Sequence, residues 1–286
     1  MAQTATTGNL ENAQKIIIAA SRYTEEHNAP AMALIESFTL PKGSKQVTVP
    51  KVGQMSMSDL VDGQDIIDEE EIGMTTVDLT AAEVGAKIIL TDKLVRQSSE
   101  NVMSIVGRQL GDGMARKKDT DVTALYSGFS TELGAAARTM SLANVSAVVA
   151  YAKGNKFGSQ VYINHHPFAV WDIANTAVTA STTYPVPKGW TEDLLGDFFS
   201  GLRPLNGVPI FEDGNITIDS SDDAVGVIAD KSALAVLKSV DTRTERQRDA
   251  SLRATELVMT SDYGVFELDD SKGAALTLDA GTPATS

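Results

Sequence analysis

Two strand-like stretches flank an acidic segment that has little with which to build a hydrophobic core of its own. Residues 46–50 and 74–90 alternate polar and apolar side chains, which is typical of strands. The polar segment between them, residues 54–71, ends in consecutive carboxylates. An isolated two-stranded ribbon is only marginally stable in water. The pattern therefore predicts a long two-stranded excursion that must lie on another surface, and this is the first indication of an assembly.

A long helix is expected within residues 91–127. An apolar residue recurs every four positions, at Val102, Val106, Leu110 and Met114. The opposite face is expected to be charged, with Arg108, Arg116, Lys117, Lys118 and Asp119. Three glycines in this stretch weaken the helix by about 1 kcal/mol each relative to alanine, although small residues also let a neighbouring helix approach closely. They are Gly107, Gly111 and Gly113.

The second half of the chain predicts a mixed α/β unit followed by extended structure. Within residues 128–240, helices are expected at 142–153, 167–177, from Trp190 onward and at 231–240, and strands at 160–164, 207–212 and 224–228. A highly charged stretch, 241–254, precedes a strand at 255–268. After a turn at 269–273, residues 275–278 are expected to pair back on that strand as a hairpin.

Charge and composition limit the function classes. The chain has 286 residues, no cysteine and a formal net charge of −14. Phosphate binding requires a clustered basic surface, so this balance argues against a protein that reads nucleic acid. A net negative charge is still compatible with a protein that forms the wall of a container, because such a wall encloses a polymer without binding it tightly. No stretch has the length of a signal-peptide core or a membrane span, so the protein is expected to stay in the compartment where it is made.

No catalytic, cofactor or metal site is indicated. The nucleophile elbow, the phosphate loop, the dinucleotide fingerprint, the zinc-protease helix and the EF-hand spacing are all missing. His165 and His166 are adjacent on an extended segment, where neighbouring side chains point apart. The acidic turn at residues 219–223 lacks the glycine and the terminal glutamate of an EF-hand loop. We therefore expect a protein that is not an enzyme and needs no cofactor.

Four stretches, together with their order, carry a resemblance to a known family. They are residues 84–98 (VGAKIILTDKLVRQS) leading to a helix that closes at 125–128 (LYSG), residues 161–167 (VYINHHP), residues 207–210 (GVPI) and residues 256–268 (ELVMTSDYGVFEL). This pattern resembles the major capsid proteins of tailed double-stranded DNA phages, which share the Hong Kong 97 fold. The resemblance covers nearly the whole chain and contains no short diagnostic signature.

The resemblance implies an α+β fold with an N-terminal arm, an extended β-loop, a long spine helix, a peripheral domain and an inserted axial domain. The arm would be residues 1–39 and the loop 40–78, with a peripheral domain of 79–127 and 241–280, an axial domain of 128–240 and a tail of 281–286. The chain would self-assemble into pentamers and hexamers that form an icosahedral head in the virion. It would be made and assembled in the cytoplasm of the host bacterium.

Partners follow from the same resemblance. The chain would contact its own copies, a portal and packaged double-stranded DNA without sequence-specific contacts, but no membrane. No long coiled-coil segment precedes the arm, which implies a separate scaffolding protein or none, and a decoration protein is a further possible partner.

Contacts between copies are expected to join acidic and basic side chains. The acidic group is in the loop, with Asp59, Asp62, Asp65, Asp68, Glu69, Glu70 and Glu71. The basic group comprises Arg116, Lys117, Lys118, Arg243, Arg246 and Arg248. Lys51, within the loop, is a further candidate contact residue.

Two other interpretations remain open. One is an encapsulin-like nanocompartment shell, which shares the fold and encloses a cargo enzyme. The other is a soluble α/β enzyme with a site in the domain of residues 128–240, against which the missing catalytic motifs argue.

Overall fold

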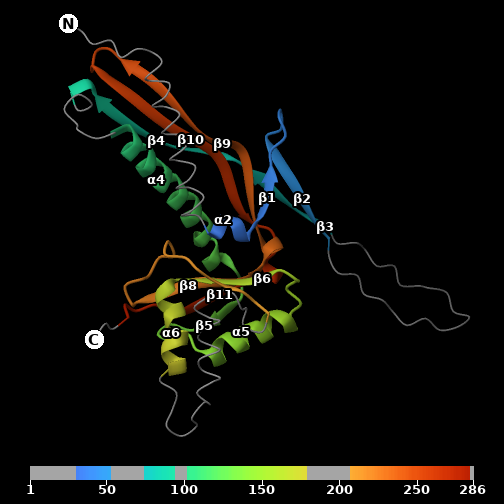
Figure 1. The fold of residues 1–286 in the computed structure, drawn as a ribbon. Coiled ribbons are helices and arrows are strands. Elements are labelled where there is room, and N and C mark those ends of the chain that lie inside the picture. Colours follow the sequence, from blue (N-terminus) through green and yellow to red (C-terminus); the bar gives the residue numbers. More distant parts are fainter. Residues whose placement is uncertain (1–29, 53–73, 94–101, 179–206, 284–286) are drawn as a thin grey trace, which may run out of the picture.

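The computed structural model describes residues 30–52, 74–93, 102–178 and 207–283, and these residues form three sheets (Figure 1). A four-stranded sheet has the order β1-β9-β10-β4. Its strands are β1 (Glu36–Thr39), β4 (Ala82–Thr91), β9 (Leu234–Asp249) and β10 (Ala254–Glu267). β9 and β10 form a long antiparallel pair, and β1 adds to β9 in parallel. The strand expected at 255–268 is confirmed as β10.

The long helix α4 (Val102–Ala124) packs on one face of this sheet, as Figure 1 shows. Val106, Leu110 and Met114 are buried in a cluster with Leu257 and Met259 of β10. The apolar stripe predicted from the sequence is therefore confirmed as the face that contacts the sheet. The helix runs unbroken through its three glycines.

The expected charged face of α4 is wrong for two of its members. Lys118 is 8% exposed and Asp119 is fully buried. The cause is a second layer of structure at this end of the helix, where Val122 joins a larger core that also contains Ala31 and the strands of a second sheet. A helix covered on two sides has no fully solvated face, so the position of a charge on the helical wheel did not determine its exposure.

The second sheet has five strands in the order β5-β11-β8-β6-β7. They are β5 (Glu132–Gly134), β6 (Val161–His165), β7 (Ile210–Glu212), β8 (Asp223–Asp230) and β11 (Gly273–Asp279). Helices α5 (Leu142–Gly154) and α6 (Pro167–Val178) lie against it (Figure 1). Ser141 caps α5 by accepting the Asn144 N–H at 3.2 Å. Both helices and strands β6 and β8 agree with the sequence prediction.

The helix expected at residues 231–240 is wrong. After a short 3-10 turn, η2 (Lys231–Ala233), the chain enters β9 at Leu234. Residues 234–237 are all fully buried, because β9 lies between β1 and β10 and both of its faces are covered here. A short apolar run of this kind is compatible with a buried helix or a buried strand, and only the tertiary neighbours decide between them.

The hairpin expected between residues 255–268 and 275–278 is also wrong. β11 pairs antiparallel with β8 and parallel with β5, and not with β10. The 3-10 turn η3 (Asp270–Lys272) carries the chain out of the four-stranded sheet and into the five-stranded sheet. Residues 273–279 are therefore part of the second sheet.

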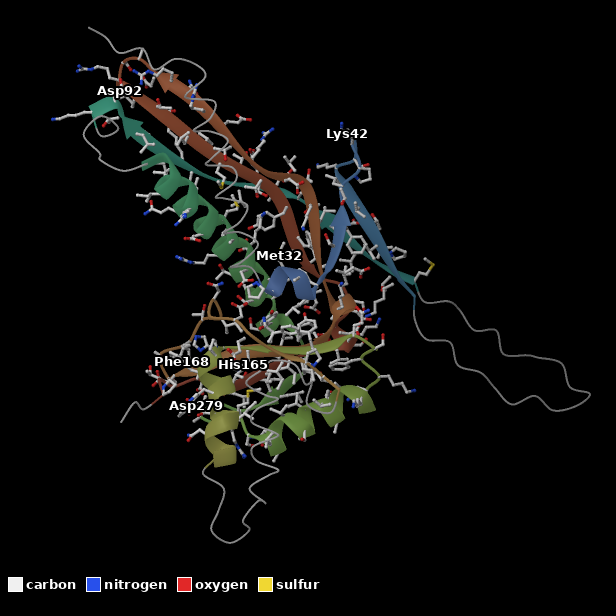
Figure 2. The ribbon with its side chains drawn as sticks, in the orientation of Figure 1. Met32, Lys42, Asp92, His165, Phe168 and Asp279 are labelled. Atoms are coloured by element: carbon white, nitrogen blue, oxygen red, sulfur yellow. The ribbon has the colours of Figure 1, made fainter. Side chains whose placement is uncertain are left out.

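The two-stranded excursion is confirmed in its described part. β2 (Gln46–Val52) and β3 (Met74–Thr80) pair antiparallel over their whole length. The turn before β2 places Gly43 at a φ of +87°, which glycine adopts without steric cost. Figure 2 places Lys42 in this turn, just before β2. The acidic connector, most of the N-terminal arm and the helix expected from Trp190 lie outside the described residues.

A short helix, α2 (Ala31–Leu34), was not predicted and lies between the two large sheets (Figure 1). Ala31 and Ile35 are buried in the larger core. Among the described residues, no helix is both long enough and apolar enough to cross a membrane.

Candidate functional site: a polar junction and the charged faces

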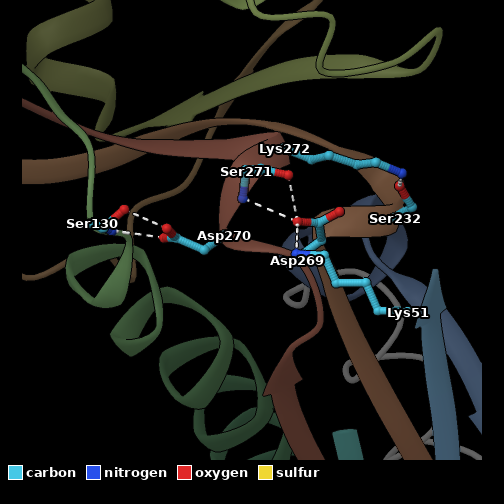
Figure 3. Close-up of polar contacts among 7 residues, drawn as sticks. All are labelled: Lys51, Ser130, Ser232, Asp269, Asp270, Ser271 and Lys272. Carbon is cyan, nitrogen blue, oxygen red and sulfur yellow. Dashed lines mark hydrogen bonds and ion pairs between the residues drawn. The ribbon is translucent and has the colours of Figure 1, made fainter. Parts of the chain in front are cut away.

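A polar junction ties the two-stranded sheet to the rest of the molecule (Figure 3). The Lys51 ammonium on β2 lies 2.5 Å from a carboxylate oxygen of Asp269. The same carboxylate accepts hydrogen bonds from the backbone N–H and the hydroxyl of Ser271, at 3.0 and 2.6 Å. Burial alone would raise the pKa of Asp269, but the hydrogen bonds from Lys51 and Ser271 outweigh it and hold the pKa below its usual value.

The same turn also holds the segment that follows α4. The Asp270 carboxylate accepts the backbone N–H of Ser130 at 2.7 Å and also the Ser130 hydroxyl. On the other side, the Lys272 ammonium donates to the Ser232 hydroxyl at 3.2 Å. The turn between β10 and β11 is therefore the point where the two-stranded sheet and both larger sheets are joined.

Two of the basic residues predicted to contact another copy form contacts within the subunit. Arg248 forms a bidentate pair with Asp92, at 2.6 and 2.7 Å, which fixes the end of β9 to the end of β4. Lys118 donates to the Thr242 hydroxyl at 3.1 Å and lies 5.6 Å from the centre of the Tyr263 ring. These contacts connect α4 to the sheet on which it packs.

Arg243 and Arg246 do not form one basic patch, because they are three residues apart on β9 and alternate residues of a strand point to opposite faces. Arg246 is opposite the buried Leu257 and belongs to the face that packs on α4. Arg243 is opposite Thr260, donates to its hydroxyl at 3.2 Å and lies 3.5 Å from Glu245 on the exposed face.

Arg116 and Lys117 remain exposed on α4, where Lys117 pairs with Asp121 at 2.6 Å, one helical turn away. The seven acidic residues expected as their partners in a neighbouring copy lie outside the described residues, so the pairing stays a prediction. Sequence reasoning missed Asp269 and Asp270 as contact residues. Their sequence indicates only a turn, since the partners Lys51 and Ser130 lie 218 and 140 positions away.

The described residues offer little that favours catalysis or metal binding. His165 is buried inside the five-stranded sheet (Figure 2), with its Nε2 atom 3.1 Å from the Leu276 carbonyl oxygen, and burial lowers its pKa to about 4. No group of three metal-ligating side chains occurs among the described residues. A groove of about 350 Å³ beside α5 is mainly apolar, with Arg138, Asn144 and Tyr151 as its longer polar side chains.

Comparison of the whole chain with solved structures identifies the fold. The capsid of Helicobacter pylori bacteriophage KHP30 matches with a TM-score of 0.71 at 11% identity, over 89% of this chain and 92% of that one. The capsid of cyanophage P-SCSP1u matches with a TM-score of 0.63 at 15% identity, over 87% of each chain. The chain has the Hong Kong 97-type capsid fold. A GTA particle capsid, at 14% identity and a TM-score of 0.62, covers 87% of this chain and 90% of its own.

The sequence prediction of an α+β Hong Kong 97-type fold is confirmed by these matches. No protein-family model matches the sequence, and no curated protein matches it significantly. The Hong Kong 97-type fold is thus retained here at an identity that leaves few residues in common with the solved capsids. This explains why the resemblance in the sequence is one of segment order.

Proposed function

We propose that this chain is a major capsid protein, which self-assembles into pentamers and hexamers to form the icosahedral head of a tailed phage. One observation carries the proposal. The chain matches eight solved phage and GTA particle structures, six of them named as capsids or heads, over 82–89% of its own length and 84–92% of theirs, with TM-scores of 0.61 to 0.71. If this chain were a catalytic domain that shares only part of the capsid fold, a large portion of one chain would remain unmatched.

The proposed division of the chain keeps the arm at residues 1–39, the extended loop at 40–78 and the tail at 281–286. Two boundaries of the other domains are revised. The peripheral domain comprises residues 79–127 together with the segment from 234 to the η3 turn, because β9 begins at Leu234 in the four-stranded sheet. The axial domain comprises residues 128–233 and 273–279, because β11 pairs with β8 in the five-stranded sheet.

Assembly would use unlike surfaces on neighbouring copies, as rings of five and six require. The two-stranded sheet projects from the body (Figure 1), and it is held there by the Lys51–Asp269 pair and by its base, where Leu79 is buried and β3 contacts β10. Such a ribbon gains stability by lying on a neighbour. Among the predicted basic contacts, Arg116, Lys117 and Arg243 are exposed on the described surface, whereas Lys118 and Arg248 already make contacts within the subunit.

The head would enclose double-stranded DNA without reading its sequence, which fits a net charge of −14. A portal, and a separate scaffolding or decoration protein, would be its further partners. The protein would act in the virion, after assembly in the host bacterial cytoplasm, and would have no enzymatic role. The buried histidine and the apolar groove supply neither a nucleophile with its base nor a metal site.

Electron microscopy with light scattering of the expressed full-length protein tests this proposal. Closed shells, or sheets and tubes of hexamers, are the expected result, alone or with a scaffolding partner. DNA in particles isolated from infected cells supports a phage head, and a packaged enzyme would instead indicate an encapsulin-like nanocompartment. A compact monomer or dimer under all of these conditions would contradict any shell function.

A further inference from the structure

Two buried carboxyl groups meet where α4, α2 and the five-stranded sheet come together. Asp119 on α4 is fully buried, and Asp213, which follows β7, is 1% exposed. Asn164 on β6 is also fully buried beside them. Removing a charged carboxylate from water is costly unless it is paired or becomes neutral. The way in which these two groups are neutralised therefore matters for the whole junction.

Hydrogen bonds to Asp119 come from two other parts of the chain. Its carboxylate accepts the backbone N–H of Ala31, at the start of α2, at 3.0 Å. It also accepts the side-chain amide of Asn215 at 2.7 Å. Asp119 therefore holds α2 and the loop after β7 against the long helix.

Asp213 is bound from within the five-stranded sheet. Its carboxylate accepts the backbone N–H of Asn215 at 2.9 Å and the side-chain amide of Asn164 at 3.5 Å. Asn164 also donates to the Tyr126 hydroxyl at 2.8 Å. Each carboxylate is thus surrounded by N–H donors, which stabilise the oxygens but cannot ligate a metal ion.

The charged and titratable groups on the surrounding elements do not neutralise the pair. On α4, Lys118 is directed toward Thr242 and Tyr263 on the four-stranded sheet. Directly after β6, burial lowers the pKa of His166, although Asp213 acts in the opposite direction. After α4, burial raises the pKa of Tyr126 well above its usual value, so this hydroxyl stays neutral.

The two carboxyl groups also act on each other. Burial, a hydrogen bond with Asp213 and the like charge of Asp213 together raise the pKa of Asp119 to about 7, against the lowering effect of the donors Asn215 and Ala31. Two acids in hydrogen-bond contact in a dry site retain one proton between them. The burial of both carboxyl groups and the raised pKa of Asp119 both favour a protonated pair.

We propose that Asp119 and Asp213 share one proton, and that this proton fastens α4 and α2 to the five-stranded sheet. Loss of the proton places two adjacent negative charges in a buried site and loosens this junction. Protonation of this pair would therefore control how firmly α4, which packs on the four-stranded sheet, is attached to the five-stranded sheet. It is a property of the single subunit and does not depend on the proposed capsid function.

The direction of the effect follows from proton linkage. In the closed junction the pair binds a proton up to near-neutral pH, whereas solvated aspartates release it near pH 4. Between these values the closed state binds more protons, so opening becomes up to about tenfold more favourable per pH unit as the pH rises. Above neutral pH the effect levels off.

Hydrogen exchange of the full-length, unassembled protein at about pH 5 and about pH 7 tests the proposal. After correction for intrinsic exchange rates, peptides covering residues 30–35, 117–126 and 210–217 should be up to about a hundredfold less protected at the higher pH. Asp119→Asn supplies an amide donor to Asp213 without a titrating proton, so protection in this variant should not depend on pH. Asp213→Asn should behave in the same way.

Asp121→Asn is the matched control. Asp121 lies on the same helix and accepts the Tyr263 hydroxyl at 2.8 Å, outside the buried pair. This variant should keep the pH dependence of the wild type. Carboxyl 13C signals of the wild type provide a reading that needs no variant, because one aspartate should titrate near neutral pH. Equal protection at both pH values, pH dependence that persists in Asp119→Asn, or aspartates that all titrate below about pH 5 would overturn the proposal.

Discussion

At the scale of single residues, the Lys51–Asp269 pair holds the two-stranded sheet to the body. The two side chains are 41% and 13% exposed, so solvent screens their attraction in part. Lys51→Met should lower the free energy of unfolding by about 1 kcal/mol or less at neutral pH. Because the pKa of Asp269 is depressed, this contribution is present above about pH 4 and is lost as the pH falls through the depressed value.

Urea unfolding of the unassembled subunit at about pH 7 and about pH 3 measures this difference. Lys42→Met is the matched control, since Lys42 lies in the exposed turn just before β2 (Figure 2). The control should match the wild type at both pH values. A Lys51→Met effect that stays constant between the two would show that lost packing, and not the ion pair, is responsible.

Gly226 on β8 illustrates how tightly the five-stranded sheet is packed. A Cβ atom at this position would lie 2.2 Å from the His165 ring and 2.6 Å from the Asn164 carbonyl oxygen. Gly226→Ala should therefore destabilise the subunit by about 1–3 kcal/mol, because the central strands must shift. Gly154→Ala, where a Cβ atom meets nothing within 4 Å, should be neutral or slightly stabilising in the same urea titration. Equal effects of the two changes would argue against the packing around His165.

At the scale of elements, sequence patterns predicted the structure where it depends on nearby residues. They failed where the structure depends on a strand that is distant in the sequence. The stripe of Val106, Leu110 and Met114 identified α4, because helical periodicity is a local property. Residues 234–237 suggested a helix because an Ala- and Leu-rich run also favours one, and the strand was selected by β1 and β10, which are distant in sequence. For the same reason, nothing in residues 275–278 indicates β8 as their partner.

The α4 helix carries a glycine in its exposed middle section. A Cβ atom on Gly113 meets nothing within 4 Å, and the helix is continuous here. Gly113→Ala should raise the free energy of unfolding of the subunit by about 0.5–1 kcal/mol, since alanine restricts the unfolded chain and favours the helix. Thermal or urea unfolding measures the change. A loss of stability would indicate that this part of α4 is not a regular helix in the free subunit.

At the scale of the whole molecule, the sites that join the sheets were the least predictable. The sequence predicted Asp119 on an exposed charged face, yet it is fully buried where two layers meet. Lys51 was expected to contact another copy, and within the subunit it pairs with a residue 218 positions away. Such contacts depend on how complete sheets pack, and no local pattern encodes that arrangement. The order of the segments nevertheless predicted the fold, because the order of helices and strands can be inferred directly from the sequence.

The proposed contacts between copies can be tested on Arg116, an exposed basic residue of α4. Arg116→Glu should slow shell formation at low salt, because it would face the acidic loop of a neighbour with a like charge, and leave subunit unfolding nearly unchanged. The additional change Glu70→Arg should restore part of the rate. Both effects should fade well above about 0.1 M salt, where charges more than about 10 Å apart are screened. Light scattering follows assembly, and Arg138→Glu beside α5 is the control with the same change in net charge. If that control slows assembly equally, overall charge is the cause, and the loop does not meet α4 through Arg116.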